Sequence, residues 1–488
     1  MLLTAELLFN YQRCRRRSFL DTYGDAQQQG CESDFLLKLQ QNSWAHRQAI
    51  VADMTYHQPQ YPRRDFIAGA EATLELMRQG VDLIYQGILR AEGPAGFTLA
   101  SSPDLLIKQP GESSFGNWLY VPTDIKLGKR PKLDYQIIVA FHAYVLASVQ
   151  GVSPETAGLL LREKGAYRVN LGQRMPQMQQ MLTECIEMLH HRQEPEVFIA
   201  RHPCSHCHWY GSCYAIATET KHLSLLPGVT PVRYTQLQAL NLTTVEALAG
   251  IDPGQLAHLT EFPDEVAGQL VLQAQSVLQN QAIATPAGLS LSPSELPTAL
   301  VELYFDIEAQ PELDLAFLHG VLVVDRQAKT ETFYPLLAEQ PAEEGAIWEQ
   351  LLNLIWTYPD APIFHFCDYE VQTFKQFAKR YNTPSHLWRP VLSRFVDVHE
   401  RVTRAAILPV ESYALKAIAR WVGFEWRDRQ ANGAQCIFWY DRWLETGDRT
   451  FLDAIRRYNE DDCRATYVVK DWLVNFLQNA DRTLVTLS

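Results

Sequence analysis

An aspartate and a lysine stand two residues apart at the end of an apolar segment, Leu119–Lys126. The segment is predicted to form a β-strand, and residues two apart on a strand point to the same face. Asp124 and Lys126 are therefore expected to face one cleft, and Asp104, from the preceding predicted strand, adds a second carboxylate. Phosphodiester hydrolysis requires carboxylates that hold divalent cations and a basic group that orients the attacking water. A D-x-K tripeptide alone is more often a solvated ion pair, so its neighbours decide its meaning.

Four cysteines lie on either side of this segment in the sequence. Cys14 precedes it, and Cys204, Cys207 and Cys213 follow it with C-x2-C-x5-C spacing. Three thiolates at this spacing can bind one metal centre from a single loop, and a fourth from Cys14 would close the coordination shell. Four thiolates suit either zinc or an iron–sulfur cluster. If the metal is zinc, two histidines inside the loop are alternative ligands, namely His206 and His208.

A second set of acidic residues lies near the end of the sequence. Asp306 and Glu308 are two apart in a predicted strand, so both carboxylates are expected on one face. Tyr458 and Asp462 are four apart in the last predicted helix, which places them on one side of that helix. A D-x-E pair alone is more often a solvated acidic strand end, and the Y-x3-D pair later in the sequence makes a functional site the better interpretation.

Two α/β patterns must position these side chains. Residues 1–220 mix predicted strands and helices, and residues 300–488 show a second α/β pattern that shares no motif with the first. Residues 221–280 change to short helices with Pro-Gly turn and Thr-Thr cap signals, which favours a helical hairpin module. Residues 281–299 are rich in Pro, Ser and Ala and are predicted to be a linker.

The predicted elements follow from hydrophobic periodicity. In the first region the predicted strands are 81–90, 97–107 and 119–126, and the predicted helices are 45–54, 70–80, 135–149 and 177–190. In the last region the predicted strands are 301–308, 315–325 and 362–366, and the predicted helices are 344–358, 371–381, 414–421 and 451–475.

The composition is that of an ordinary globular protein. Of the 488 residues 47% are apolar and 20% are charged, and the length suggests two or three domains. No segment approaches the roughly 18 uninterrupted apolar residues that a membrane helix needs, so no membrane partner is expected. Nine cysteines without a recognisable export signal favour a cytoplasmic location over a disulfide framework. The net charge of −13 argues against a protein that coats nucleic acid, so any basic groove must be local.

The order of motifs in residues 1–215 resembles the RecB-like PD-(D/E)xK nucleases that carry an iron–sulfur cluster. The resemblance implies that Asp104 and Asp124 bind Mg²⁺ or Mn²⁺ and that Lys126 positions the nucleophilic water. It also implies a [4Fe-4S] cluster that clamps the two ends of the domain together. The implied cluster ligands are Cys14, Cys204, Cys207 and Cys213.

Two further residues follow from this resemblance. The family has a metal-binding histidine on an early helix, which corresponds by position to His46, with His57 as the alternative. The family often carries a Gln and a Tyr on the helix after the lysine. Gln136 matches the first of these, but no Tyr follows it at the usual distance.

Residues 300–480 resemble the DnaQ-like (DEDD) exonucleases of RNase H-like fold, in their tyrosine subtype. The resemblance implies that Tyr458 orients the attacking water between two metal ions. The implied metal ligands are Asp306, Glu308, Glu370 and Asp462. The family's second motif, an Asn and then an aromatic–Asp pair, is altered here: Glu370, after an aromatic residue, matches the acid best, and Asp368 is the alternative. Residues 412–416 resemble the SLK segment of a related branch.

The whole arrangement resembles a RecB-like nuclease family that joins an iron–sulfur PD-(D/E)xK nuclease to a C-terminal RNase H-like exonuclease. The implied fold is α/β and multidomain: a restriction-endonuclease-type core with an Fe-S clasp, a small module similar to helix-hairpin-helix domains, and an RNase H-like domain. For that small module, a helical spacer without binding function is an equal alternative.

The implied activity is metal-dependent cleavage of DNA, at single-stranded ends, in repair, recombination or defence, with RNA not excluded. Two other functions stay open. The protein could be a non-catalytic or singly active nucleic-acid-binding subunit of a helicase–nuclease complex, or an electron-transfer iron–sulfur protein. The chain has no G-x4-G-K-[ST] sequence, so a helicase would be a separate partner.

Overall fold

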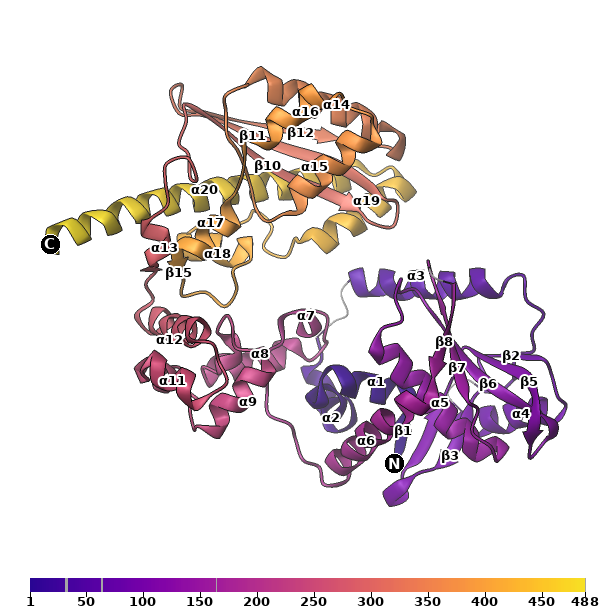
Figure 1. Ribbon diagram of the computed structural model, residues 1–488. Helices are drawn as coiled ribbons and strands as arrows, with labels where there is room; N and C mark the ends of the chain where they lie inside the picture. The colour runs from indigo at the N-terminus through magenta and orange to yellow at the C-terminus, as the bar shows by residue number, and fades with distance from the viewer. Residues whose placement is uncertain (31–33, 63–64, 164, 488) are drawn as a thin grey trace. The chain divides into compact units, whose positions relative to one another are not determined.

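The structure is a computed structural model that describes residues 1–30, 34–62, 65–163 and 165–487. It contains two compact units, Met1–Ile216 and Ala217–Ser488, each with its own sheets and hydrophobic core (Figure 1). Helices and strands are mixed in both units, which confirms the expectation of an α/β protein with more than one domain. Among the residues described, no helix is both long and apolar enough to cross a membrane.

A five-stranded sheet frames the first unit. Its strands, in spatial order, are β2 (Leu83–Tyr85), β5 (Leu105–Ser113), β6 (Gly116–Lys126), β7 (Thr156–Leu161) and β8 (Gly165–Asn170). β6 and β7 are parallel, so the chain crosses between them through a helix, α5 (Leu133–Gln150). A smaller sheet has the order β1 (Leu2–Thr4), β4 (Thr98–Ser101) and β3 (Leu89–Glu92).

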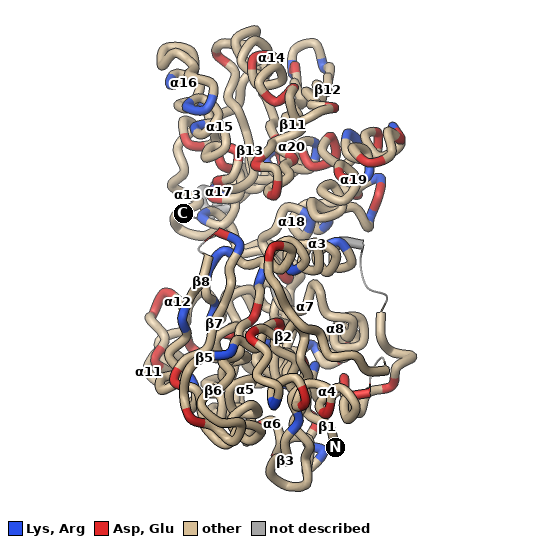
Figure 2. Tube along the Cα trace, turned by 90° about the vertical axis from the view of Figure 1, so that its right-hand side faces the viewer, with Lys and Arg blue, Asp and Glu red and all other residues tan. Residues whose placement is uncertain are grey.

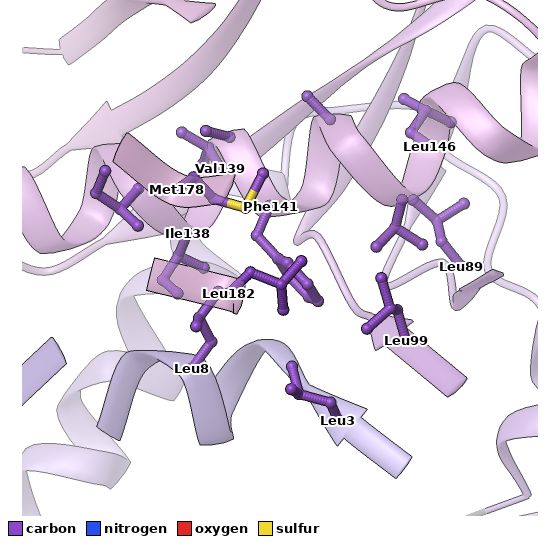
Figure 3. Close-up of a cluster of buried hydrophobic side chains, with 14 of the residues drawn as sticks. Leu3, Leu8, Leu89, Leu99, Ile138, Val139, Phe141, Leu146, Met178 and Leu182 are labelled. Carbon is purple, nitrogen blue, oxygen red and sulfur yellow. The ribbon is translucent and has the colours of Figure 1, made fainter. Parts of the chain in front are cut away.

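α5 lies at the centre of the first hydrophobic core. It is apolar on nearly all sides, as expected for a helix enclosed by protein, and 11 of its 18 residues are buried. Figure 3 shows Phe141 of α5 packed near Leu8 of α1 (Ala5–Arg13) and Leu182 of α6 (Leu171–His190). The core therefore joins the N-terminal helices to the helix that leads into the cysteine loop.

The other helices of the first unit are short or peripheral. They are α2 (Arg15–Tyr23), α3 (Asp34–Val51), α4 (Phe66–Arg78), α7 (Arg201–Cys204) and α8 (Tyr210–Glu219). α3 overlaps the helix predicted at residues 45–54, but it starts eleven residues earlier, at Asp34, and ends at Val51.

Two strands predicted as continuous, residues 81–90 and 97–107, are each broken in the structure. β2 and β3 belong to different sheets, and Gln86 between them has a left-handed φ of 54°. β4 and β5 are separated at 102–104, where the chain also passes from one sheet to the other. The Gln86 amide donates to the Asp104 carbonyl oxygen at 2.9 Å, so the two breaks lie side by side. The breaks contain Gly87 and Pro103, residue types that interrupt strands, so the prediction of two continuous strands gave too much weight to the apolar residues on either side.

Short helices form the first part of the second unit. They are α9 (Pro231–Ala239), α10 (Val245–Gly250), α11 (Pro253–Leu259) and α12 (Asp264–Gln279). Thr230 and Thr244 cap α9 and α10 with their side chains, as their positions before the helices predict. The following stretch, predicted to be a linker, contains β9 (Ile283–Ala284) and α13 (Pro286–Leu289). β9 pairs with β15 (Ala406–Ile407), so this stretch is attached to the C-terminal α/β layers.

A second five-stranded sheet organises residues 300–487. Its order is β12 (Thr330–Leu337), β11 (Leu315–Asp325), β10 (Val301–Gln310), β13 (Ile363–His365) and β14 (Phe395–Asp397). β11 is antiparallel to both of its neighbours, β12 and β10. β13 is parallel to β10, and β14 is parallel to β13.

Helices cover both faces of this sheet. One layer contains α14 (Glu344–Thr357), α15 (Tyr369–Arg380) and α16 (Ser385–Leu392). The other contains α17 (Val398–Ala405), α18 (Leu415–Val422), α19 (Gly433–Thr446) and α20 (Arg449–Leu487). Leu303, Phe305 and Ile307 of β10 pack in the core of the first layer, so the alternate residues Asp306 and Glu308 point toward the second.

Acidic and basic residues are interspersed over both units rather than gathered on one element (Figure 2). Several carboxylates that contribute to the net charge of −13 are buried instead of exposed, namely Asp104, Asp124, Glu308 and Glu370. Burial of an ionised carboxylate is costly unless a cation or hydrogen bonds compensate for it, so these positions mark candidate sites.

Candidate metal-binding sites

Three carboxylates come together beneath α20 in the second unit. Asp306 and Glu308 leave one face of β10, and Asp462 comes from α20, one turn after Tyr458. One oxygen atom of each carboxylate lies within 4.8 Å of the others. Within the described part of the chain, no other three His, Cys, Asp or Glu ligand atoms gather this closely. Oxygen ligands of this kind suit Mg²⁺ or Mn²⁺.

Burial raises the pKa values of these three carboxylates, and neighbouring acidic groups add to the increase. For Asp306 and Glu308, burial is the largest cause of the increase, and the charge of Asp462 is the second. The pKa values of Asp306 and Glu308 lie well above the ordinary range, and the pKa of Asp462 rises to about 6. A cation among the three groups would favour their ionised forms, so the donor set fits a divalent metal ion.

Tyr458 is buried beside Asp462. The ammonium of Lys416, in α18, lies 4.8 Å from the centre of the Tyr458 ring, and the Trp426 indole N–H donates to Asp462 at 2.7 Å. Burial, reinforced by the charge of Asp462, raises the pKa of Tyr458 far above its ordinary value. The phenol is therefore neutral and able to donate a hydrogen bond. Lys416 is the lysine of the segment that resembles the SLK motif.

Glu370 and Asp368 are placed differently. Glu370 is 4% exposed, and its charge contributes to the raised pKa values of Asp306 and Glu308. Its Oε2 lies 3.6 Å from His365 Nδ1. Asp368 is exposed at the start of α15. Of the two alternatives that the sequence left open, Glu370 is the one directed toward the carboxylate group.

The first unit brings a second pair of carboxylates together at the strand break. Asp104 immediately precedes β5, and the antiparallel register of β5 and β6 sets it beside Asp124. The Asp104 amide donates to Asp124 Oδ1 at 3.3 Å, and the Ile125 amide donates to Asp104 Oδ2 at 2.8 Å. The Lys126 ammonium lies 2.8 Å from Asp124 Oδ2. The three residues predicted from the sequence to share a cleft are thus in one cluster.

The two carboxylates of this cluster have opposite pKa shifts. Burial, and then the charge of Asp124, raises the pKa of Asp104. Burial also acts to raise the pKa of Asp124, but Lys126 and His142 outweigh it and hold that pKa well below its ordinary value. Burial acts to lower the pKa of Lys126, and the carboxylates outweigh it and raise the pKa. At neutral pH the cluster therefore contains an ionised Asp124 and a charged Lys126.

His142 belongs to this cluster, although the sequence did not single it out. Its Nε2 lies 3.3 Å from Asp124 Oδ1, and its Nδ1 lies 2.5 Å from Ser101 Oγ. All three side chains are buried. The available signal was a lone histidine in the apolar helix that follows the D-x-K strand, which is a weak signal without the tertiary contact.

α3 supplies a cationic side chain beside Asp104. Arg47 lies 3.7 Å from Asp104 Oδ1. The adjacent His46 has a buried Nε2 that, among the described residues, has no hydrogen-bond partner. Burial, followed by the charges of Arg162 and Arg47, lowers the pKa of His46, so the ring is neutral, as a metal ligand must be.

The remaining two candidates of the first unit have other contacts. His57 is exposed, and its backbone pairs with Ile84 at the edge of β2. Gln136 donates to the Pro131 carbonyl at 2.7 Å and accepts from Arg174 at 2.8 Å. These hydrogen bonds connect α5 to the preceding loop and to α6, so the amide of Gln136 is not directed at the carboxylates.

The four predicted cysteine ligands lie in the first unit, two of them against its core. Cys207 and Cys213 pack against the core around α5. Burial raises the pKa of Cys204 to about 11, and the charges of the other three cysteines add to this increase. The Ala200 amide donates to Cys204 Sγ at 3.3 Å, and the Arg17 amide donates to Cys14 Sγ at 3.4 Å.

Asp21 fastens the N-terminal helices to the cysteine loop. Its Oδ1 accepts from Trp209 Nε1 at 2.8 Å and lies 2.9 Å from His208 Nε2, while its Oδ2 accepts from Asn10 at 3.1 Å. Of the two histidines that are alternative zinc ligands, His208 directs its Nε2 at Asp21, and His206 is exposed. All four cysteines are half-buried, and burial raises the pKa values of Cys204, Cys207 and Cys213. Binding of a metal ion would favour the thiolate forms.

Comparison with known proteins bears on the second unit. A model of the RNase H superfamily matches residues 303–474. A search of curated proteins found no match to the chain. The matched region runs from residue 303 in β10 to residue 474 in α20, and it therefore includes all of the carboxylate group beneath α20. The expectation of an RNase H-like C-terminal domain is confirmed, and nucleases of this superfamily process nucleic acids with divalent metal ions, for which the carboxylate group is a candidate site.

Proposed function

We propose that this protein is a metal-dependent nuclease that hydrolyses phosphodiester bonds in DNA at single-stranded ends, using two separate sites. The observation that carries the proposal is the group formed by Asp306, Glu308 and Asp462 under Tyr458, within the RNase H-like domain. Burial raises the pKa values of these carboxylates, and the charge of Lys416, which acts to lower the pKa values of Glu308 and Asp462, does not outweigh it. A divalent cation is the ligand that such a group favours.

In the RNase H-like domain, the roles follow from position and protonation state. Asp306, Glu308, Glu370 and Asp462 would hold the cations, which when bound neutralise charge on the phosphate and stabilise the transition state. Tyr458, neutral and adjacent to Asp462, would position the attacking water through its hydroxyl.

In the first unit, Asp104 and Asp124 would hold a cation, with the neutral His46 as a further ligand. Lys126, charged and 2.8 Å from Asp124, would orient the attacking water and balance charge on the phosphate. His142 would keep Asp124 ionised and oriented from the opposite side.

The four cysteines are proposed to hold a [4Fe-4S] cluster with a structural role. What supports this is the mutual electrostatic influence of the four thiols and their contact with the core through Cys207 and Cys213. Zinc is the other metal that suits four thiolates. An anaerobic absorption spectrum with metal quantitation distinguishes the two, since only the cluster absorbs visible light and contains about four irons.

The test of the nuclease proposal uses purified full-length protein and end-labelled single strands, duplexes and RNA with Mn²⁺ or Mg²⁺. Asp306→Ala and Asp124→Ala are assayed singly and together. Each single variant should lose one cleavage activity, and the double variant should lose all cleavage, as EDTA does. Tyr458→Phe should lower cleavage in the RNase H-like domain by about 10²-fold, the scale of general acid–base contributions.

Glu370→Ala and Asp368→Ala form a matched pair for this assay. Only the first should reduce cleavage, because only Glu370 faces the carboxylates. Unchanged cleavage by the Asp306→Ala/Asp124→Ala double variant would overturn the proposal. Binding of single strands without metal-dependent cleavage would support the non-catalytic subunit instead.

A further inference from the structure

Asn459 is a fully buried amide in contact with the carboxylate group beneath α20. It is 0% exposed and follows Tyr458 directly in α20. Its Nδ2 donates to Asp306 Oδ2 at 2.6 Å. It also hydrogen-bonds Glu308, which acts to lower the pKa of that acid against the effect of burial. One amide nitrogen, with two N–H groups, thus serves both acids of β10.

The other end of the Asn459 amide depends on a glycine. Among the described residues, its Oδ1 is buried without a hydrogen-bond partner. Gly320 of β11 lies directly opposite Asp306 in the strand pairing. A Cβ atom on Gly320 would lie 1.6 Å from Asn459 Oδ1, far inside any contact distance.

Gly320 therefore provides the space that Asn459 occupies. The Cys463 thiol, one turn further along α20, contacts the Gly320 carbonyl oxygen at 3.5 Å, so the helix approaches the strand closely at this point. The lost hydrogen bond at Oδ1 is a cost that packing alone does not explain, because an apolar side chain of the same size would avoid it.

We propose that Asn459 is a positioning residue for the metal-binding carboxylates and that Gly320 is the position that allows it to act. The inference rests on the proposed function of this site and deepens it. By donating to one oxygen of Asp306, the amide orients the carboxylate and leaves the other oxygen for a cation. Hydrogen-bonding partners of this kind behind metal ligands typically change metal affinity by 10–100-fold when removed.

The test measures Mn²⁺ binding directly, by electron paramagnetic resonance of free Mn²⁺, in full-length protein. All variants are made in an Asp124→Ala background, so that the first unit contributes no binding. Asn459→Leu preserves the size of the side chain and removes the donor. It should weaken Mn²⁺ binding by about tenfold, while the circular dichroism spectrum of the metal-free variant matches that of the parent and shows that the variant is folded.

Gly320→Ala provides the independent arm. It should weaken Mn²⁺ binding to a similar extent because the new methyl group displaces Asn459. In Asn459→Ala protein the displaced side chain is absent, so adding Gly320→Ala should cause no further loss. This non-additivity is the signature of a shared mechanism and is not expected of two separate packing defects.

The outcomes separate this inference from the proposed function. If the parent binds Mn²⁺ and Asn459→Leu binds it equally well, or if the two substitutions lower affinity independently, the positioning role is wrong and the nuclease proposal stands. If the parent binds no Mn²⁺, the proposed metal site itself is wrong, and this inference fails with it.

Discussion

At the scale of single residues, the two candidate sites differ in how neighbouring charges change the pKa values of their buried carboxylates. In the first unit, Lys126 and His142 hold the pKa of Asp124 below its ordinary value against the effect of burial. Beneath α20, burial and neighbouring acids raise the pKa values of Asp306 and Glu308 instead. At the first site, cationic side chains outweigh the effect of burial on Asp124, whereas at the second site the charge of Lys416 does not outweigh burial and the neighbouring acids.

This contrast predicts a pH dependence of metal binding at the second site. Protons compete with the cation for carboxylates of raised pKa, so Mn²⁺ affinity should rise with pH. Below about pH 6, where Asp462 becomes protonated, each pH unit should lower the affinity by at least about tenfold. Titrations of Asp124→Ala protein with Mn²⁺ between pH 5 and 8 measure this, and a constant affinity over that range would contradict it.

Stability should change in the opposite sense when metal is withheld. A carboxyl group with a raised folded-state pKa binds more protons in the folded than in the unfolded state. Its contribution to the free energy of unfolding therefore falls as pH rises from its ordinary pKa through the raised one.

Trp426→Phe serves as a directional control. In the Mn²⁺ titrations, this substitution removes the indole N–H that lowers the pKa of Asp462, so the pH below which Mn²⁺ affinity falls should be higher than in the parent.

At the scale of elements, a buried ion pair sets the register of α20 on β10. Lys470 Nζ lies 2.7 Å from Glu302 Oε1, both side chains are 0% exposed, and Arg326 and Tyr304 also bind Glu302. Glu302 is four residues before Asp306 on the strand, a span of about 13 Å. Lys470 is eight residues after Asp462 on the helix, a span of about 12 Å. Because the two spans are similar, contact between Lys470 and Glu302 at one end places Asp462 beside Asp306 at the other.

We therefore expect Lys470→Met to destabilise the second unit by on the order of 3 kcal/mol, because it leaves a buried carboxylate with fewer partners. The double variant Glu302→Leu/Lys470→Met should recover much of that loss. Denaturant unfolding measures both. Arg442→Ala, which removes an exposed i,i+3 pair with Glu445, is the matched control and should cost less than about 1 kcal/mol. A Lys470→Met protein as stable as the control would contradict the assigned role.

At the scale of the whole molecule, the chain consists of two compact units with separate cores. Cys14, Cys204, Cys207 and Cys213 all lie in the first. Loss of one of these thiols should therefore affect the first unit and leave the RNase H-like domain intact.

We expect Cys14→Ser protein, purified anaerobically, to lose its metal and to show a lower melting transition for the first unit. The transition of the second unit and the cleavage that depends on Asp306 should be unchanged. Calorimetry with metal quantitation measures this, and Cys185→Ala, a buried cysteine in the core of the first unit, is the control that should retain the metal. A shift of both transitions by Cys14→Ser would contradict independent units.

The sequence by itself determined the α/β character of both units, most of the regular elements and the short-range motifs. D-x-K, D-x-E and Y-x3-D are readable because residues two apart on a strand or four apart on a helix share a face whatever the remainder of the chain does. D-x-E and Y-x3-D, in this order, carry the resemblance to RNase H-like exonucleases from which that domain was expected.

Only the tertiary structure decided which side chains meet across elements. The strand breaks that set Asp104 beside Asp124, the contact of His142 with Asp124 and the choice of Glu370 over Asp368 all depend on pairing between distant segments. Asn459 and Gly320 show this most directly, since one is an ordinary helix residue and the other an ordinary strand glycine in sequence. Contacts between segments far apart in the chain leave no local periodicity, and for that reason local patterns cannot predict them.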